Sequence, residues 1–188
     1  MKDSHETEIK IPVSDLAPYR AILVSSGAAP VSEPHLERNT LFDDPEGRLA
    51  ASNVALRVRQ ARGRGILTFK GPASFEGPIK RREELEVEVS DPALLETILQ
   101  RLGYAAKFRY EKRREEFRWR ECVVALDETP IGSFIEIEGE AGAIGEAVKW
   151  LGLDAGDAAR SSYAGLYRRA RDKDSRLPPD MLFPEPSR

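Results

Sequence analysis

The sequence predicts an α+β fold in which antiparallel strands dominate and a few helices pack against them. Two observations support this prediction. Many segments alternate apolar and polar residues at the period of a strand, and turn-forming Gly, Pro, Asp or Asn separate most of them. A smaller number of segments carry apolar residues at the i, i+3, i+4 spacing of a helix. With 188 residues, the chain is long enough to bury a core.

The predicted strands are short and follow one another closely along the chain. Side chains two residues apart in a strand lie on the same face, so each of these segments offers one apolar and one polar face to its surroundings. The segments with this alternation are Glu6–Val13, Val54–Gln60, Gly65–Lys70, Lys80–Val89, Phe108–Glu115, Phe117–Leu126 and Ser133–Glu138.

The clearest helix follows Asp91 and Pro92. Asp91 is a suitable N-cap, proline is favoured at the first helical position, and Gly103 is a suitable C-terminal stop. Three more helices are expected, from Ser14 or Asp15 to Gly27, from about Ile144 to Gly152, and from about Ser161 to Ala170.

The charge composition excludes several classes of protein. The 29 Lys and Arg residues nearly cancel the 32 Asp and Glu residues, leaving a net charge of −3, whereas nucleic-acid binders usually carry a basic excess. No apolar run reaches the roughly 18 residues of a membrane span, and residues 1–10 lack the apolar core of a signal peptide. One cysteine, Cys122, and two histidines exclude a disulfide framework and make a His-rich zinc site improbable. We therefore expect a protein of the reducing cytoplasm whose metal, if any, is held by carboxylates.

The charges on the predicted strands are segregated by sign. An ordinary half-exposed strand mixes Thr, Ser, Lys and Glu on its solvated face, and that remains the simplest explanation for any one strand. Here, however, some strands carry only acids on the charged face and others only bases. The acidic sets are Glu6 with Glu8, Glu84 with Glu86 and Glu88, and Glu136 with Glu138; the basic sets are Arg57 with Arg59, and Lys112 with Arg114.

If the sheet curls so that these faces point inward, the interior becomes a cavity lined by acids and bases. Such a cavity would hold ligand and water, because desolvating unpaired charges is too costly. Arginine and lysine suit an oligophosphate, and clustered carboxylates suit Mg²⁺ or Mn²⁺. A polyphosphate with a divalent metal accounts for both signs of charge.

Several motifs resemble those of the CYTH superfamily, the triphosphate tunnel metalloenzymes, in order and spacing. This superfamily includes class IV (CyaB-type) adenylate cyclases, thiamine triphosphatases and inorganic triphosphatases. The resemblance extends from Glu6 to Tyr167. The motifs are ETEIK at residues 6–10, LRVR at 56–59, TFKGP at 68–72, REELEVEV at 82–89, KRR at 112–114, LD at 126–127, GSFIEIE at 132–138 and SY at 162–163.

The resemblance implies an eight-stranded antiparallel β-barrel, the tunnel, with helices packed outside it. The tunnel domain would cover residues 1–172, and an irregular proline-rich tail residues 173–188. Carried over by motif, Glu6, Glu8 and Lys10 would form the catalytic centre. The triphosphate would be bound by Lys10, Arg57, Arg59, Lys70, Arg82, Lys112 and Arg114. Mg²⁺ or Mn²⁺ would be held by Glu6, Glu8, Asp127, Glu136 and Glu138, with Glu84 and Glu86 as acids of the tunnel wall.

The activity that the resemblance favours is metal-dependent hydrolysis of inorganic or nucleoside triphosphate. The first alternative is an adenylate cyclase that makes cyclic AMP and pyrophosphate from ATP, and the second is a noncatalytic module that binds polyphosphate or nucleotide. Animal-type thiamine triphosphatases carry an aromatic residue where this chain has Ala55, which makes thiamine triphosphate less favoured. We expect a small triphosphate as partner, no nucleic acid or membrane, and a monomer or homodimer.

Three features stay open at this stage. Asp127 precedes Glu128, Thr129 and Pro130, so by itself it resembles a turn residue, whereas the motif makes it a metal ligand. Strict alternation places Phe134 on the side of Glu136, which conflicts with a core role unless a bulge intervenes. The basic residues of the last helix are either a solvated face or a closure for one mouth of the tunnel; they are Arg168, Arg169 and Arg171.

Overall fold

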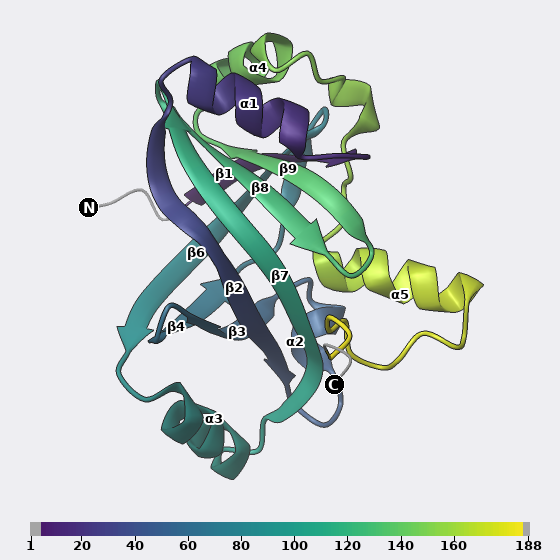
Figure 1. Cartoon of the computed structure of the whole chain (residues 1–188). Helices are drawn as coiled ribbons and strands as arrows, with labels where there is room; N and C mark the ends of the chain where they lie inside the picture. The colour runs from purple at the N-terminus through teal and green to yellow at the C-terminus, as the bar shows by residue number, and fades with distance from the viewer. Residues whose placement is uncertain (1–4, 186–188) are drawn as a thin grey trace.

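Figure 1 shows the computed structural model of the chain, which describes residues 5–185. Within this range all the strands belong to one antiparallel sheet. The strands are β1 His5–Val13, β2 Ala29–Asp43, β3 Ala55–Ala61, β4 Arg64–Lys70, β5 Ser74–Glu76, β6 Ile79–Val89, β7 Ala105–Trp119, β8 Cys122–Thr129 and β9 Gly132–Glu138.

The sheet closes on itself. Its order is β1-β9-β8-β7-β2-β3-β4-β6-β5, and β1 also pairs with β6. Strand β5 pairs with the first residues of β6 and β4 with the later ones, so β5 continues the β4 edge beyond Gly71 and Pro72. The expected eight-stranded antiparallel barrel is therefore confirmed, with β5 as an addition to it.

The helices lie outside the barrel (Figure 1). Asp91 caps α3 by accepting a hydrogen bond from the Leu94 N–H at 2.9 Å, and Ser162 caps α5 by accepting one from the Gly165 N–H at 3.2 Å. Over residues 5–185 no helix is both long and apolar enough to cross a membrane. The helices are α1 Ala17–Ser25, α2 Arg48–Ala51, α3 Pro92–Arg101, α4 Ala141–Trp150 and α5 Tyr163–Lys173, with a 3₁₀ turn, η1, over Ala155–Asp157.

The main apolar core lies between the outer face of the barrel and helices α1 and α4. Ile9 and Ile11 of β1 are each 2% exposed, and Ile135 and Ile137 of β9 are fully buried. Cys122 belongs to the same cluster. Burial of these apolar side chains supplies the main stabilisation of this half of the barrel.

The opposite face of the same strands is also buried. Glu8 and Lys10 alternate with Ile9 and Ile11 along β1, yet they are only 7% and 6% exposed. On β7, Lys112 is 3% exposed. The charged faces therefore point into the barrel, and a solvated outer face is the wrong explanation for these strands.

Two strand predictions were incomplete. The sequence did not predict β2, because Pro30 and Pro34 interrupt its alternation; its pairing with β7 shifts register between Pro30 and Ser32 and again between Ser32 and His35. The predicted break after Glu115 is also wrong. Strand β7 continues to Trp119, and the hairpin turns at Arg120, whose φ is 51°.

Helix α5 ends at Lys173, and residues 174–185 form an irregular segment that is tied to the barrel. The Met181 N–H donates to the Arg109 carbonyl and the Glu111 N–H donates to the Met181 carbonyl, each at 2.9 Å. Met181 is fully buried in a cluster with Phe134, whose ring lies edge-on to Tyr163 with 5.3 Å between centroids. Phe134 thus packs on the inward face without a bulge in β9. Residues 186–188 of the expected tail lie outside the described residues.

Candidate active site

A cavity of about 410 Å³ occupies the interior of the barrel, within the size range of small-molecule sites. Ten cationic side chains line it against three carboxylates. The cations are Lys10, Arg57, Arg59, Lys70, Lys80, Arg82, Lys112, Arg114, Arg160 and Arg168, and the carboxylates are Glu6, Glu8 and Glu136. All seven residues predicted to bind the triphosphate thus line one cavity, together with three of the five predicted metal ligands.

Strand register explains how the motifs meet. Lys10 on β1 lies opposite Glu136 on β9, and Glu8 lies opposite Glu138. Across the β1–β6 closure, Glu6 lies opposite Arg82. Because each pair shares a face of the sheet, side chains far apart in sequence project into the same space.

One group of ion pairs centres on Glu136 and Asp127. Lys10 Nζ lies 2.7 Å from Glu136 Oε1, and Arg114 bonds to both Glu136 and Asp127. Although burial alone would raise the pKa of Glu136, Lys10, Lys112 and Arg114 hold it well below its usual value. Burial would likewise lower the pKa of Lys10, but Glu136 and Glu8 raise it. These groups therefore stay charged at neutral pH.

Asp127 does not line the cavity. Its side chain is fully buried and accepts hydrogen bonds from Arg114 at 2.6 and 2.7 Å, Lys112 at 3.1 Å and the Tyr163 hydroxyl at 2.7 Å. In this structure the carboxylate orients two of the predicted phosphate-binding cations; its predicted role as a metal ligand stays a prediction.

A second group of ion pairs lies on β1, β4 and β6. Lys70 Nζ bridges Glu6 at 2.8 Å and Glu84 at 2.7 Å, and Lys80 Nζ lies 2.7 Å from Glu8. Arg57 contacts Glu86 at 3.3 Å and Glu84 at 3.6 Å. Glu84 and Glu86 are not among the residues that line the cavity; they lie behind its cations and hold them.

Arg82 differs from the other predicted phosphate ligands because its bonds go to the backbone. Its guanidinium donates to the carbonyls of Gly71, at 2.6 and 3.0 Å, and Lys70, at 3.0 Å. Desolvation lowers its pKa. These bonds fix the bend between β4 and β5, so some of the N–H donors of Arg82 are already used by the backbone and are not free to bind phosphate.

Glu138 lies opposite Glu8 in the β1–β9 register, but it is exposed and, unlike Glu6 and Glu8, it does not line the tunnel cavity. Within residues 5–185 no three side chains of the usual ligand types are arranged as a ready metal site, because Glu6 and Glu8 are turned to lysines. Partial desolvation and repulsion from Glu6, Glu84 and Glu8 nevertheless raise the pKa of Glu138 to about 7. Carboxylate oxygens are the donors that Mg²⁺ or Mn²⁺ takes, so the chemistry of Glu6, Glu8 and Glu138 suits such an ion although their present arrangement does not form its site.

This pKa predicts a pH-dependent effect of Glu138→Gln on stability. Glu138 has an ordinary pKa of 4.5 when unfolded and about 7 when folded, so the folded state holds the proton more tightly between these values. Its contribution to stability therefore falls as the pH rises from about 4.5 to about 7. In EDTA, we expect Glu138→Gln to raise the melting temperature relative to wild type at pH 8, and to raise it much less at pH 5. Solvent screening of this exposed side chain keeps the change in melting temperature small.

The exposed Glu128→Gln is the control for this comparison, because Glu128 lies on the barrel surface in a pair with Arg113. If the melting temperatures of Glu138→Gln and wild type differ by the same amount at the two pH values, the raised pKa of Glu138 is contradicted.

Sequence reasoning missed the inward residues of β2. Glu37 is 2% exposed and lies 3.2 Å from Arg59 and 3.5 Å from Lys112. Despite its burial, Lys112 and Arg59 hold the pKa of Glu37 well below its usual value. Glu37, Asn39 and Leu41 do alternate at the strand period, a signal that could have found them once β2 was recognised.

Tyr110 and Tyr163 were also missed as cavity residues. The Tyr163 ring lies under Lys10, with 4.2 Å from Nζ to the ring centroid, and the Arg57 guanidinium donates to the Tyr110 hydroxyl at 3.4 Å. Tyr163 was identified only as part of the SY motif and Tyr110 was not singled out, because nothing in an isolated tyrosine distinguishes a cavity wall from a core.

Five buried polar atoms on β2 and β3 have no hydrogen-bond partner within the described part of the chain. They are Glu37 Oε2, Asn39 Nδ2 and Oδ1, Arg57 Nε and Arg59 Nε. Burying such a group without any partner costs about 1 to 3 kcal/mol. Glu37 Oε2 still has an ion pair with Lys112, and of the other residues only Arg57 and Arg59 line the cavity, where a polar ligand could reach them.

Comparison with known proteins agrees with this geometry. The chain is 27% identical over 147 residues to "Putative adenylate cyclase MJ0240" of Methanocaldococcus jannaschii, covering 78% of this chain and 83% of that protein. It is 29% identical over 135 residues to adenylate cyclase CyaB of Aeromonas hydrophila, covering 70% and 67%.

Solved structures show the same fold. HpAC1 of Hippeastrum, described as having a dominant triphosphatase activity, matches with a TM-score of 0.67 at 21% identity, covering 88% of this chain and 96% of that one. The family model of the CYTH domain matches residues 4–165. The protein with this charged barrel interior therefore belongs to the CYTH domain family.

Proposed function

We propose that this protein is a divalent-metal-dependent triphosphatase that hydrolyses a triphosphate inside its barrel. The observation that carries the proposal is the excess of cations over carboxylates among the residues that line the cavity. Carboxylates behind the wall hold several of these cations in place, so the lining presents fixed ammonium and guanidinium groups to which a compact oligophosphate could bind at several points. Membership in a family with adenylate cyclases and a triphosphatase-active relative supports the same class of substrate.

Binding would proceed by exchange of partners. Lys70 and Lys80 now neutralise Glu6 and Glu8, so phosphate oxygens that take these lysines leave the two carboxylates unpaired. Together with Glu138, the freed carboxylates would be the residues that hold Mg²⁺ or Mn²⁺. Triphosphate and metal would then each favour the binding of the other.

The side chains of the chain supply binding and electrostatic stabilisation. Arg57, Arg59, Lys112 and Arg114 would hold the phosphate chain and offset the charge that develops on phosphoryl oxygens as the bond breaks. Lys10, fixed by Glu136 and the Tyr163 ring, would place a further cation beside the attacking water. A divalent ion, when bound, would neutralise phosphate charge and acidify that water. Burial of these groups strengthens each interaction by lowering the local dielectric.

Adenylate cyclase activity is the alternative, favoured by the names of the curated relatives. It needs the ribose 3′-hydroxyl of ATP as nucleophile and releases pyrophosphate. Hydrolysis needs no group that reads adenine, and the sequence contains no recognisable adenine-reading motif, which is why hydrolysis remains the preferred proposal.

A parallel product assay tests the proposal. Tripolyphosphate, ATP and thiamine triphosphate are incubated with the protein and Mg²⁺ or Mn²⁺, and phosphate, pyrophosphate and cyclic AMP are measured. We expect metal-dependent phosphate release without cyclic AMP, and its loss in EDTA. Cyclic AMP with pyrophosphate would support the cyclase instead. Tight binding of every substrate without turnover would support the noncatalytic module, and undiminished turnover in EDTA would overturn the metal requirement.

A further inference from the structure

Helix α5 contributes to the wall of the tunnel cavity but has little to hold it in place by itself. Its N-terminal residues, 162–165, line the cavity, and Tyr163 extends from them to Lys10 and Asp127. Its second half, RRARDK at residues 168–173, offers a single alanine to pack on the barrel. A helix of 11 residues is only marginally stable alone in water, so the position of α5 depends on other parts of the chain.

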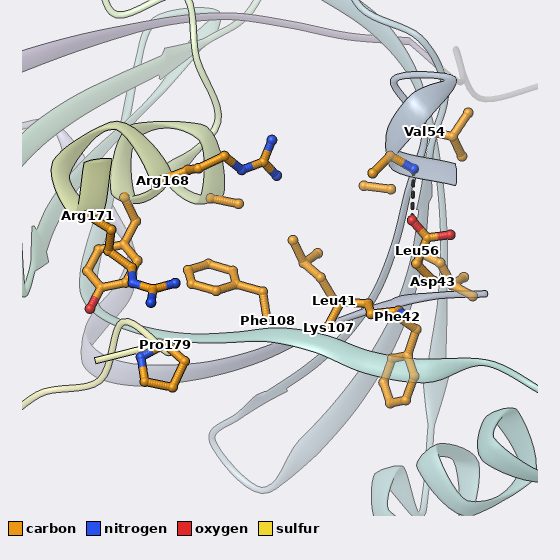
Figure 2. A pocket seen from close by; sticks show the side chains of 14 residues that line it. Leu41, Phe42, Asp43, Val54, Leu56, Lys107, Phe108, Arg168, Arg171 and Pro179 are labelled. Atoms are coloured by element: carbon orange, nitrogen blue, oxygen red, sulfur yellow. Dashed lines mark hydrogen bonds between the residues drawn. The ribbon is translucent and has the colours of Figure 1, made fainter. Parts of the chain in front are cut away.

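The segment after α5 turns back beneath the helix, as its yellow trace in Figure 1 shows. We call residues 177–183 the strap. The Tyr167 hydroxyl donates to the Pro178 carbonyl at 2.9 Å, and Arg171 Nε donates to the first carbonyl of the strap at 3.3 Å. Figure 2 shows Pro179 of the strap below Arg171 of α5 and beside strand β7. The strap thus holds the part of α5 that has few apolar side chains of its own.

The strap is also bound to strand β7. Beside the two backbone hydrogen bonds of Met181, the Arg109 N–H donates to Asp180 Oδ1 at 2.8 Å. The Arg113 guanidinium lies over the Phe183 ring, 4.1 Å from its centroid. The strap is therefore tied to a strand of the barrel on one side and to α5 on the other.

The Met181 side chain lies where α5 meets the barrel. It is fully buried in a cluster with Tyr110, Phe134, Tyr163 and Tyr167. Tyr163 and Tyr167 are four residues apart on α5, so their side chains lie on the same face of the helix. Met181 fills the space that these two tyrosines share with β7 and β9, and its packing fixes how close α5 lies to the barrel.

Tyr163 connects this packing to the tunnel. Its ring centroid lies 4.2 Å from Lys10 Nζ and 5.4 Å from Lys112 Nζ, and its hydroxyl donates to Asp127 at 2.7 Å. The face of an aromatic ring attracts an ammonium group and helps to hold it in one place. A shift of α5 would move this ring away from Lys10, the cation that the proposed mechanism places beside the attacking water.

From these contacts we infer that Met181 is a positioning residue: through the strap it fixes α5, and α5 places Tyr163 under Lys10. The inference rests on the proposed triphosphatase function. The strap lies after residue 165, where the match to the CYTH family model ends, so it adds to the barrel a part that the family model does not describe.

The test measures kcat and KM for tripolyphosphate with Mg²⁺ in the wild type, Met181→Ala, Met181→Leu and Leu182→Ala. We expect Met181→Ala to lower kcat about ten-fold and to leave KM within about two-fold, because α5 relaxes into the vacated space and Lys10 loses its position. Met181→Leu, of similar volume, should restore most of kcat. Leu182→Ala is the matched control: Leu182 is the next residue of the strap but is 44% exposed, and its removal should change neither value.

Hydrogen–deuterium exchange in EDTA separates this inference from the proposed function, because it needs no turnover. We expect the amides of α5 to exchange faster in Met181→Ala than in the wild type, with exchange in β1 and β9 unchanged. Tripolyphosphate should slow the exchange of α5 and of the Met181 amide in the wild type, since ligand and strap favour the same position of α5. Tyr167→Phe keeps the ring and loses the hydroxyl bond to the strap, so it should show the same changes to a smaller degree if Met181→Ala folds poorly.

Two results would overturn the positioning role. One is a wild-type kcat in a folded Met181→Ala protein, and the other is faster exchange spread evenly over the barrel and α5, which indicates a general loss of stability. If the wild type hydrolyses no triphosphate, the proposed function fails. Faster exchange confined to α5 would then still support the strap as the part of the chain that fixes this helix.

Discussion

Glu6→Ala and Glu8→Ala are each expected to lower metal-dependent phosphate release at least about a hundred-fold while the protein stays folded. Both carboxylates line the tunnel cavity, and both would be freed for metal when triphosphate takes their lysine partners. Folding should survive because Lys70 keeps Glu84 at 2.7 Å after Glu6 is removed, and Lys80 is near enough to solvent, at 14% exposure, to be rehydrated. Phosphate release at saturating Mg²⁺ or Mn²⁺ and the circular dichroism spectrum are the two measurements.

Glu88→Ala is the matched control for these variants. Glu88 is also a strand glutamate paired with an arginine, Arg64, but both side chains are more than 70% exposed and neither lines the cavity. Its removal should leave activity unchanged and alter stability by less than about 1 kcal/mol. Full activity in a folded Glu6→Ala or Glu8→Ala protein would remove these residues from the metal site and, with them, the proposed mechanism.

The charge pattern of the sequence could predict the cavity because strand alternation fixes which side chains share a face. Lys10, Arg57, Lys70 and Glu136 therefore meet as expected once the barrel closes. What the alternation does not encode is the pairing across the cavity. Whether Asp127 meets solvent, a metal or Arg114 depends on the curvature of the barrel and on where α5 places Tyr163, which are properties of the whole fold.

Properties of the whole fold also explain why sequence reasoning missed strand β2 and the inward position of Phe134. Strand β2 contains two prolines and three shifts of register with β7, so its alternation is broken although its inner residue Glu37 is fully enclosed. Phe134 violates the simple division into an apolar outer and a charged inner face, because Tyr163 and Met181 cover part of the interior with apolar surface. Local period predicts the strands well, and tertiary packing decides the exceptions.

Asp127→Ala is expected to be the most destabilising of the charge-removing substitutions considered. Its carboxylate is fully buried and bonded to Arg114, Lys112 and Tyr163. Removing one partner of a buried ion pair costs about 3 to 5 kcal/mol where the remaining charge is uncompensated, and Glu37 and Glu136, which still pair with Lys112 and Arg114, place the expected loss at the lower end of this range. Urea unfolding at pH 7.5 should show this loss of unfolding free energy for Asp127→Ala. The loss should be smaller for Asp127→Asn, which keeps one oxygen acceptor, and almost zero for Glu128→Ala at the neighbouring exposed position.

Tripolyphosphate should restore part of the stability lost in Asp127→Ala, because its oxygens can replace the carboxylate that Lys112 and Arg114 lose, while Glu37 and Glu136 remain as their other partners. The restored stability, measured in EDTA, should exceed the stabilisation that the same ligand gives the wild type. A metal-ligand role predicts a different result: an Asp127→Ala protein of wild-type stability without metal, with weakened Mg²⁺ or Mn²⁺ dependence. That result would contradict the positioning role and return Asp127 to the metal-binding set, since the removal of a carboxylate that held only metal would take no partner away from the cations.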